Sequence, residues 1–125
     1  MAKKDRAEVP EWMIDRIRGV VGRLPRVHEE EAWVGVRWQV GGATFAHIFG
    51  GEDQQIRVTL RGEADEVAAF QHLGPPYFKA EWGGNVIGMV LDGDTDWEEV
   101  GELLVDSYCL RAPAHLAEAV DRPQR

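Results

Sequence analysis

The first pattern along the chain is that of an amphipathic helix. Its apolar positions recur at helical spacing, at Met13, Ile17, Val20, Val21 and Leu24. Arginines lie outside this stripe, so the pattern predicts a helix with one buried side. Because proline cannot continue a helix, we expect this one to end near Pro25.

Alternating apolar and polar positions predict three strands after this helix. Residues 33–40 alternate with Val34, Val36, Trp38 and Val40 on one face, and Gly41-Gly42 suits a tight hairpin turn. Residues 44–49 form a second strand, whose faces stay unassigned because both alternations contain large apolar groups. In a third strand, residues 56–61, the apolar side chains face one way and Arg57, Thr59 and Arg61 face the other.

The second half of the chain predicts two further strands between helices. Residues 63–72 have the composition of a short helix that Gly74-Pro75-Pro76 stops. Strands follow at 77–82 and 86–91, joined through Gly83-Gly84-Asn85. Thr95 or Asp96 then caps a long helix, and Pro113 lies in the expected first turn of a last short one.

This element order predicts an α+β fold in a single domain. The strand connections are short enough for hairpins except the one through the middle helix, which favours an antiparallel sheet of about five strands with helices on one face. A chain of 125 residues has room for one core. We expect a flexible lead over residues 1–10, the domain over 11–120 and a flexible tail over 121–125.

Composition excludes several classes of protein. Apolar residues make up 44% of the chain and charged residues 29%, as in an ordinary folded protein. The longest apolar runs are far shorter than a membrane span requires, and the first residues lack the apolar stretch of a signal peptide. With the single Cys109 no intrachain disulfide can form, so we expect a cytoplasmic protein.

Charge is distributed unevenly along the chain. The net charge is −8, yet the first 26 residues are net basic. Residues 92–106 are the most acidic stretch, with carboxylates and no basic residue. An acidic surface opposes non-specific affinity for a polyanion, although a local basic patch can still bind one.

None of the spacings that signal metal or nucleotide chemistry is complete. Asp92, Asp94 and Asp96 have the spacing that opens a calcium loop, but Trp97 and Leu103 stand where glycine and glutamate are needed. These aspartates therefore predict a strand-to-helix turn. The glycines at 83, 84 and 88 lack the lysine of a phosphate loop and precede a strand.

Candidate nucleophiles and metal ligands also lack the sequence motifs of a catalytic or metal site. The histidines, at positions 28, 47, 72 and 115, lie on separate elements without ligand spacing. Ser107 and Cys109 fall late in a helix without a nucleophile motif, and Ser107 is expected to be a packing residue. We therefore expect a protein that is not an enzyme and has no cofactor or metal.

One surface could carry a binding site. If the sheet face away from the helices is open, the basic side chains that alternate outward form a patch: Arg37, Arg57, Arg61 and Lys79. Trp33 and Tyr77 share these alternations and supply aromatic neighbours for stacking or for a pocket.

The order of several short motifs resembles the MmcQ/YjbR-like family. They are Leu24-Pro25-Arg26-Val27-His28-Glu29, Trp33, Phe45-Ala46, Pro76-Tyr77-Phe78, Trp82, Asp96-Trp97 and Ser107-Tyr108. The similarity covers residues 11–118, and residues 75–113 look most like the actinobacterial, hence bacterial, branch. The resemblance implies an α-β3-α-β2-α antiparallel fold and a DNA-binding function, without catalytic or metal residues.

Two functions follow for the open sheet. The first is nucleic-acid binding, with Arg37, Arg57, Arg61 and Lys79 on phosphates and Trp33 or Tyr77 stacking on bases. The second is a protein-interaction or chaperone-like adaptor that holds a partner on the same face or its edge. The family resemblance favours the first hypothesis, whereas the acidic charge favours the second; no membrane partner is expected.

Overall fold

The computed structural model describes residues 5–80 and 85–120, with the side chain of Lys79 left out. The strands are β1 (His28–Glu31), β2 (Val36–Val40), β3 (Ala43–Gly50), β4 (Ile56–Arg61), β5 (Tyr77–Lys79) and β6 (Val86–Leu91). The helices are α1 (Glu11–Val21), α2 (Ala64–Leu73), α3 (Trp97–Arg111) and α4 (Ala114–Ala117). Trp82, the predicted turn at Gly83-Gly84 and the predicted tail lie outside the described residues.

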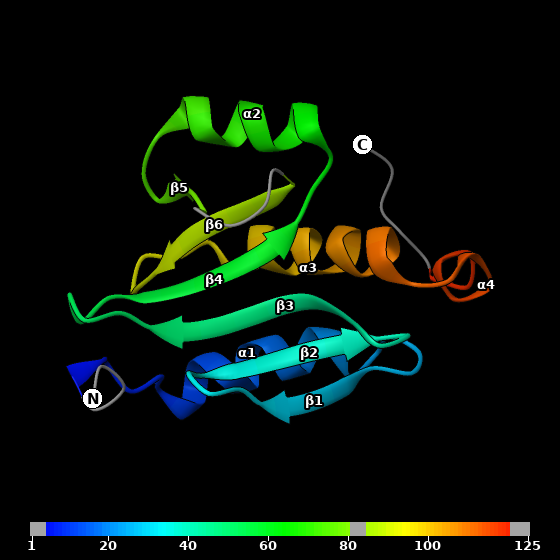
Figure 1. Ribbon diagram of the computed structural model, residues 1–125, viewed down its shortest axis with the longest axis horizontal. Helices are drawn as coiled ribbons and strands as arrows, with labels where there is room; N and C mark the ends of the chain where they lie inside the picture. Colours follow the sequence, from blue (N-terminus) through cyan, green and yellow to red (C-terminus); the bar gives the residue numbers. More distant parts are fainter. Residues whose placement is uncertain (1–4, 81–84, 121–125) are drawn as a thin grey trace.

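The strands form one antiparallel sheet with its helices on one side, which confirms the predicted fold class. Their order is β1-β2-β3-β4-β6-β5, and each pairing is antiparallel. In Figure 1, α1 and α3 lie behind the sheet and α2 lies beyond β5 and β6. The side that faces the viewer carries no helix among the described residues, and we call it the open face.

Within residues 5–80 and 85–120 the sheet has six strands, one more than predicted. The additional strand, β1, has the sequence His-Glu-Glu-Glu and shows no apolar alternation. It pairs with β2 at the edge of the sheet, where charged side chains are favoured because they discourage further pairing. Two predicted strands are shorter, since β2 begins only at Val36 and β5 ends at Lys79.

A β-bulge in β3 explains why its faces could not be assigned from sequence. Trp38 pairs with Ala46 but the next residue, Gln39, pairs with Thr44, which leaves Phe45 as the extra residue. Phe45 is 1% exposed and meets Tyr108 of α3 edge-on, with ring centroids 5.5 Å apart. The bulge therefore lets two consecutive residues, Phe45 and Ala46, face the helices.

The core lies between the sheet and the pair α1 and α3. Its fully buried side chains include Ile17 of α1, Trp38 of β2 and Leu104 of α3. As predicted, Asp96 caps α3, where its carboxylate accepts hydrogen bonds from two backbone amides of the first turn. Residues 6–9 of the predicted lead also lie against the sheet, since the Ala7 amide donates to the Gly51 carbonyl at 3.0 Å.

Ser107 of α3 joins the helix to two neighbouring strands. It is fully buried, and its hydroxyl donates to the carbonyl of Phe45 at 2.5 Å. The backbone amide of Arg61 donates to the same oxygen at 2.8 Å. The predicted packing residue thus satisfies two backbone groups beside the bulge, where the β3–β4 pairing ends at Ala46 and Leu60.

Candidate functional site

The register of the sheet shows which predicted residues share the open face. Directly paired residues point to the same side of a sheet. Arg37 pairs with His47 and, through it, with Thr59 on β4. Arg57 and Arg61 lie two positions either side of Thr59, so all three arginines belong to the open face.

Three other predicted residues do not join this group. Tyr77 pairs with Met89 of the core row, contacts the ring of Phe70 and donates a hydrogen bond to Glu99 of α3. It therefore belongs to the helix-covered side, which corrects the predicted placement. The backbone of Lys79 pairs with Ile87 in that same row, and its side chain lies outside the described part. Trp33 lies in the β1–β2 loop and is 62% exposed.

Two of the three arginines are already paired with carboxylates. The Arg37 guanidinium donates to Glu30 on the neighbouring edge strand, with Nε 2.6 Å from Oε1. The Arg57 guanidinium donates two hydrogen bonds, of 2.9 and 2.5 Å, to the carboxylate of Asp53. These hydrogen bonds lower the pKa of Asp53 to about 2, so the pair persists at every pH well above that value.

Arg61 differs because burial and the charge of Arg111 lower its pKa. Arg61 therefore has a positively charged neighbour, whereas Arg37 and Arg57 each have a negatively charged one. The open face thus carries two arginines, Arg37 and Arg57, that are ion-paired with carboxylates of the chain, and one, Arg61, without an ion pair among the described residues. The partners that cause this, Glu30 and Asp53, come from a strand and a loop that carry no periodic signal.

An open groove with a volume of about 850 Å³ lies at one end of the sheet, where β5 begins and β6 ends. Its residues come from the start of β4, the α2–β5 connection and the β6–α3 turn: Gln55, Arg57, Pro75, Pro76, Tyr77, Phe78, Val90, Asp92, Asp94, Thr95, Asp96 and Glu99. We call it the β5–β6 groove. Sequence reasoning missed it because segments that are far apart along the chain build it.

The floor of the β5–β6 groove is apolar and partly aromatic. Phe78 pairs with Gly88, and a Cβ built on Gly88 would fall 2.5 Å from the Phe78 ring. The ring therefore lies across the glycine on the open face. The Arg57 guanidinium lies 5.7 Å from the centre of this ring, a distance at which a cation interacts with an aromatic face.

One wall of the groove is the predicted strand-to-helix turn. The Asp92 amide donates to the Thr95 hydroxyl at 2.7 Å, and the Asp94 amide donates to the Asp92 carboxylate at 2.8 Å. The Tyr77 hydroxyl donates a hydrogen bond to the carboxylate of Glu99. Burial and that carboxylate raise the pKa of Tyr77. Within the described ranges no group of three histidine, cysteine, aspartate or glutamate side chains could hold a metal ion.

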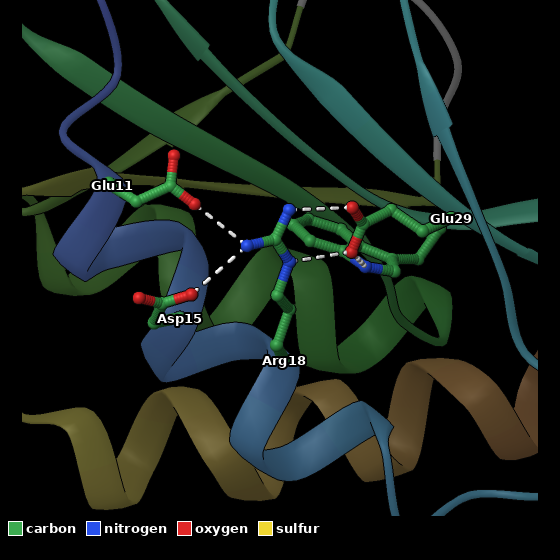
Figure 2. Close-up of polar contacts among 5 residues, drawn as sticks. Glu11, Asp15, Arg18 and Glu29 are labelled. Atoms are coloured by element: carbon green, nitrogen blue, oxygen red, sulfur yellow. Dashed lines mark hydrogen bonds and ion pairs between the residues drawn. The ribbon is translucent and has the colours of Figure 1, made fainter.

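A second acidic cluster, shown in Figure 2, connects α1 to the edge strand β1. Arg18 donates to Glu11 at 2.7 Å, to Asp15 at 3.0 Å and to both oxygens of Glu29. Glu29 also accepts a hydrogen bond of 3.0 Å from the indole of Trp38. Because an arginine fills the cluster, we interpret it as a structural link between helix and sheet.

This link predicts a specific dependence of stability on pH. Hydrogen bonds from Arg18 and Trp38 lower the pKa of Glu29 below its ordinary 4.5, although burial opposes the shift. A lowered folded-state pKa contributes stability that is present above the ordinary value and is lost as pH falls through the folded value. Glu29→Gln should therefore cost up to about 1 kcal/mol at neutral pH, since the pair is partly exposed.

Urea unfolding from pH 7 to pH 3 would measure this, and the difference between Glu29→Gln and the natural protein should shrink below the ordinary pKa of 4.5. The glutamine keeps an oxygen that can accept from the Trp38 indole. A difference that stays constant with pH would mean that the carboxylate charge does not contribute.

The fold and the groove together define a class of small α+β domain in which one sheet face is covered by none of the described helices. The sequence profile of the YjbR family matches residues 22–110, so this chain belongs to the YjbR family, as the ordered motifs predicted. The actinobacterial branch stays a prediction.

A solved structure has the same fold. The crystal structure of the Deinococcus radiodurans protein DR2400, which has a DUF419 domain, superposes with a TM-score of 0.64. The two sequences are 21% identical, and the match covers 88% of this chain and 81% of the other. No curated protein matches the chain. No helix in the described segments is long and apolar enough to cross a membrane.

Proposed function

We propose that this domain is a non-catalytic protein-interaction domain that holds a peptide segment of a partner in the β5–β6 groove. The groove carries the proposal: its volume of about 850 Å³ and the apolar and aromatic part of its lining, Tyr77, Phe78 and Val90, can take apolar side chains. It also opens toward the face of the sheet that no described helix covers. This is the adaptor hypothesis, now with a defined site.

The arginines of the open face support a protein partner over a nucleic acid. A phosphate that binds Arg57 must compete with a bidentate carboxylate, Asp53, and one that binds Arg37 must compete with Glu30. Neutralised arginines release few counterions, so they add little to the affinity for DNA. The net charge of −8 acts in the same direction.

The environments of Ser107 and His47 support a non-catalytic role. Ser107 is fully buried and both of its hydrogen bonds go to backbone groups. His47 bonds the carbonyl of Val34 at 2.7 Å, and burial lowers its pKa. Neither side chain is placed to act on a substrate in the groove.

A DNA titration tests the first half of the proposal. Fluorescence anisotropy with single-stranded and duplex DNA at low salt should show no binding in the micromolar range, and the variant with Arg37, Arg57 and Arg61 replaced by alanine should behave identically. Binding whose log affinity falls with log salt at a slope near −3, and loses about one unit of slope per arginine removed, would return the nucleic-acid hypothesis to first place.

A peptide library tests the second half. The library is displayed without charge bias and selected on the natural domain. Some of the selected peptides should no longer bind the variant Gln55→Trp. Gln55 is an exposed lining residue, and a tryptophan there would occupy space in the groove. The control variant is His115→Trp, which adds the same ring on α4, at the other end of the sheet in Figure 1.

Selected peptides should bind the control variant as they bind the natural protein. If Trp33→Ala and not Gln55→Trp removes binding, the exposed β1–β2 loop is the docking site and the groove is not. If no peptide is selected, the interaction proposal fails.

A further inference from the structure

Charge divides the β5–β6 groove into two unlike walls. Four carboxylates lie on the side of the β6–α3 turn, at Asp92, Asp94, Asp96 and Glu99. The opposite side contributes one basic residue, Arg57, whose guanidinium is held by Asp53. An apolar floor with one acidic wall has a strong preference for the charge of its occupant.

The hydrogen bonds of these carboxylates leave their charge in place. Asp92 accepts from a backbone amide, Asp96 caps α3 and Glu99 accepts from the Tyr77 hydroxyl. Among the described residues none of the four has a cationic side chain within ion-pair distance. The N-terminus of α3 supplies only a partial positive charge, about half an elementary charge.

The other acidic cluster of the chain is different in this respect. There the guanidinium of Arg18 forms ion pairs with Glu11, Asp15 and Glu29 from within the chain (Figure 2). The groove has a comparable number of carboxylates and an apolar floor beside them, but no arginine or lysine of the described chain reaches them. A cation from outside the chain would complete the groove as Arg18 completes that cluster.

The aromatic floor favours an organic cation over a metal ion. Arg57 already lies 5.7 Å from the ring of Phe78, which shows that this ring accepts a guanidinium at its face. Tyr77 lies on the other side of the groove, hydrogen-bonded to a carboxylate. The described side chains do not gather as metal ligands, whereas carboxylates beside aromatic rings suit arginine or lysine.

We propose that the β5–β6 groove binds an arginine- or lysine-bearing segment of a partner protein, with the basic side chains on Asp92, Asp94 and Glu99 and the apolar stem over Phe78 and Tyr77. This inference rests on the proposed function, because it names the chemistry of the segment that the groove holds. Long basic side chains match the site, since their stems are apolar and only their ends are charged.

The test measures a short fluorescein-labelled peptide that contains arginine, proline and glycine. The groove variant combines Asp92→Asn, Asp94→Asn and Glu99→Gln. The amides at positions 92 and 99 keep an oxygen that can accept the hydrogen bonds from the Asp94 amide and the Tyr77 hydroxyl. Asp96 is retained because it caps α3. Anisotropy should show binding to the natural protein and an affinity about tenfold lower for this variant, because three partly exposed charge pairs are lost.

A matched variant separates the groove from the general attraction of an acidic protein. Glu63→Gln, Asp65→Asn and Glu118→Gln together remove the same charge at exposed sites that do not line the groove. This control should change the affinity by less than about twofold, because salt screens charges beyond the Debye length. Phe78→Leu keeps an apolar side chain but removes the ring, and should weaken binding about three- to tenfold.

The outcomes distinguish this inference from the proposed function. Equal losses in the groove and control variants would mean general charge attraction and would overturn the inference. Library peptides that Gln55→Trp displaces but that carry no basic residues would overturn it while the interaction proposal stands. If neither library peptides nor the arginine peptide depends on the groove, both fail.

Discussion

Replacing Ser107 with alanine is expected to lower the free energy of unfolding by about 2–4 kcal/mol, because two buried backbone groups lose their hydrogen-bond partner. The groups are the carbonyl of Phe45 and the amide of Arg61. Ser107 is 0% exposed, so bulk water does not reach the site. Urea unfolding followed by tryptophan fluorescence would measure the loss directly.

The control for this prediction removes a hydroxyl at a less buried position. Thr44 of β3 is half-buried, and its hydroxyl accepts a long hydrogen bond of 3.4 Å from the side chain of Gln39. Thr44→Val should therefore change the stability by less than about 1 kcal/mol. A Ser107→Ala loss as small as that would show that the bulge does not need the hydroxyl.

Gly35→Ala is expected to cost about 3–4 kcal/mol, through backbone strain and a collision with a core strand. Gly35 has a φ of 74°, a conformation that L side chains rarely adopt. A Cβ there would lie 1.8 Å from the carbonyl oxygen of Ile48 on β3. Either the loop before β2 or the strand β3 must move, and thermal and urea unfolding would both report the loss.

Gly42→Ala is the control that has the backbone strain without the collision. Gly42 has a similar φ of 79°, but a Cβ there meets no atom within 4 Å. Gly42→Ala should lower the free energy of unfolding only by the energy that an alanine needs to adopt a left-handed conformation, about 1–2 kcal/mol. Equal losses for the two variants would contradict the role assigned to the contact with Ile48.

Periodic elements with one buried face were predictable from the sequence. The stripe of α1 and the alternation of β4 both follow from burial of one side. In α1 Met13, Ile17 and Val21 are buried, whereas Val20 and Leu24 are partly buried. In β4 the apolar positions are buried, and the outward Thr59 is buried too. The cap at Asp96 was predictable because capping depends on a few adjacent residues. Local physical rules settle such features without knowledge of the rest of the fold.

The features that the sequence did not predict depend on contacts between distant segments. The strand β1 carries three consecutive glutamates and is extended because its backbone pairs with that of β2. Arg18 and Arg37 provide positive charge for two of these glutamates. The bulge at Phe45 exists only in the pairing of β3 with β2. Neither leaves a periodic signal in its own segment.

The same limit applies to the candidate site. Alternation assigned Arg37, Arg57 and Arg61 to one face, and their register confirms that placement. It also assigned Tyr77 to this face. In the register of β5, however, Tyr77 pairs with the core residue Met89, so its side chain points to the helix-covered side, beside Glu99. The carboxylates that neutralise the arginines, and the groove itself, required the tertiary structure.

The position of α3 in the chain has a consequence for folding during synthesis. This helix covers β3 and β4, packs on α1 and contributes Tyr108, whose hydroxyl donates to the Pro25 carbonyl at 2.6 Å. A chain that grows from its N-terminus therefore completes β3 and β4 before the helix that covers them exists. Ile48 of β3 and Val58 of β4 therefore lack this helix on the ribosome until α3 emerges, and the final core closes only then.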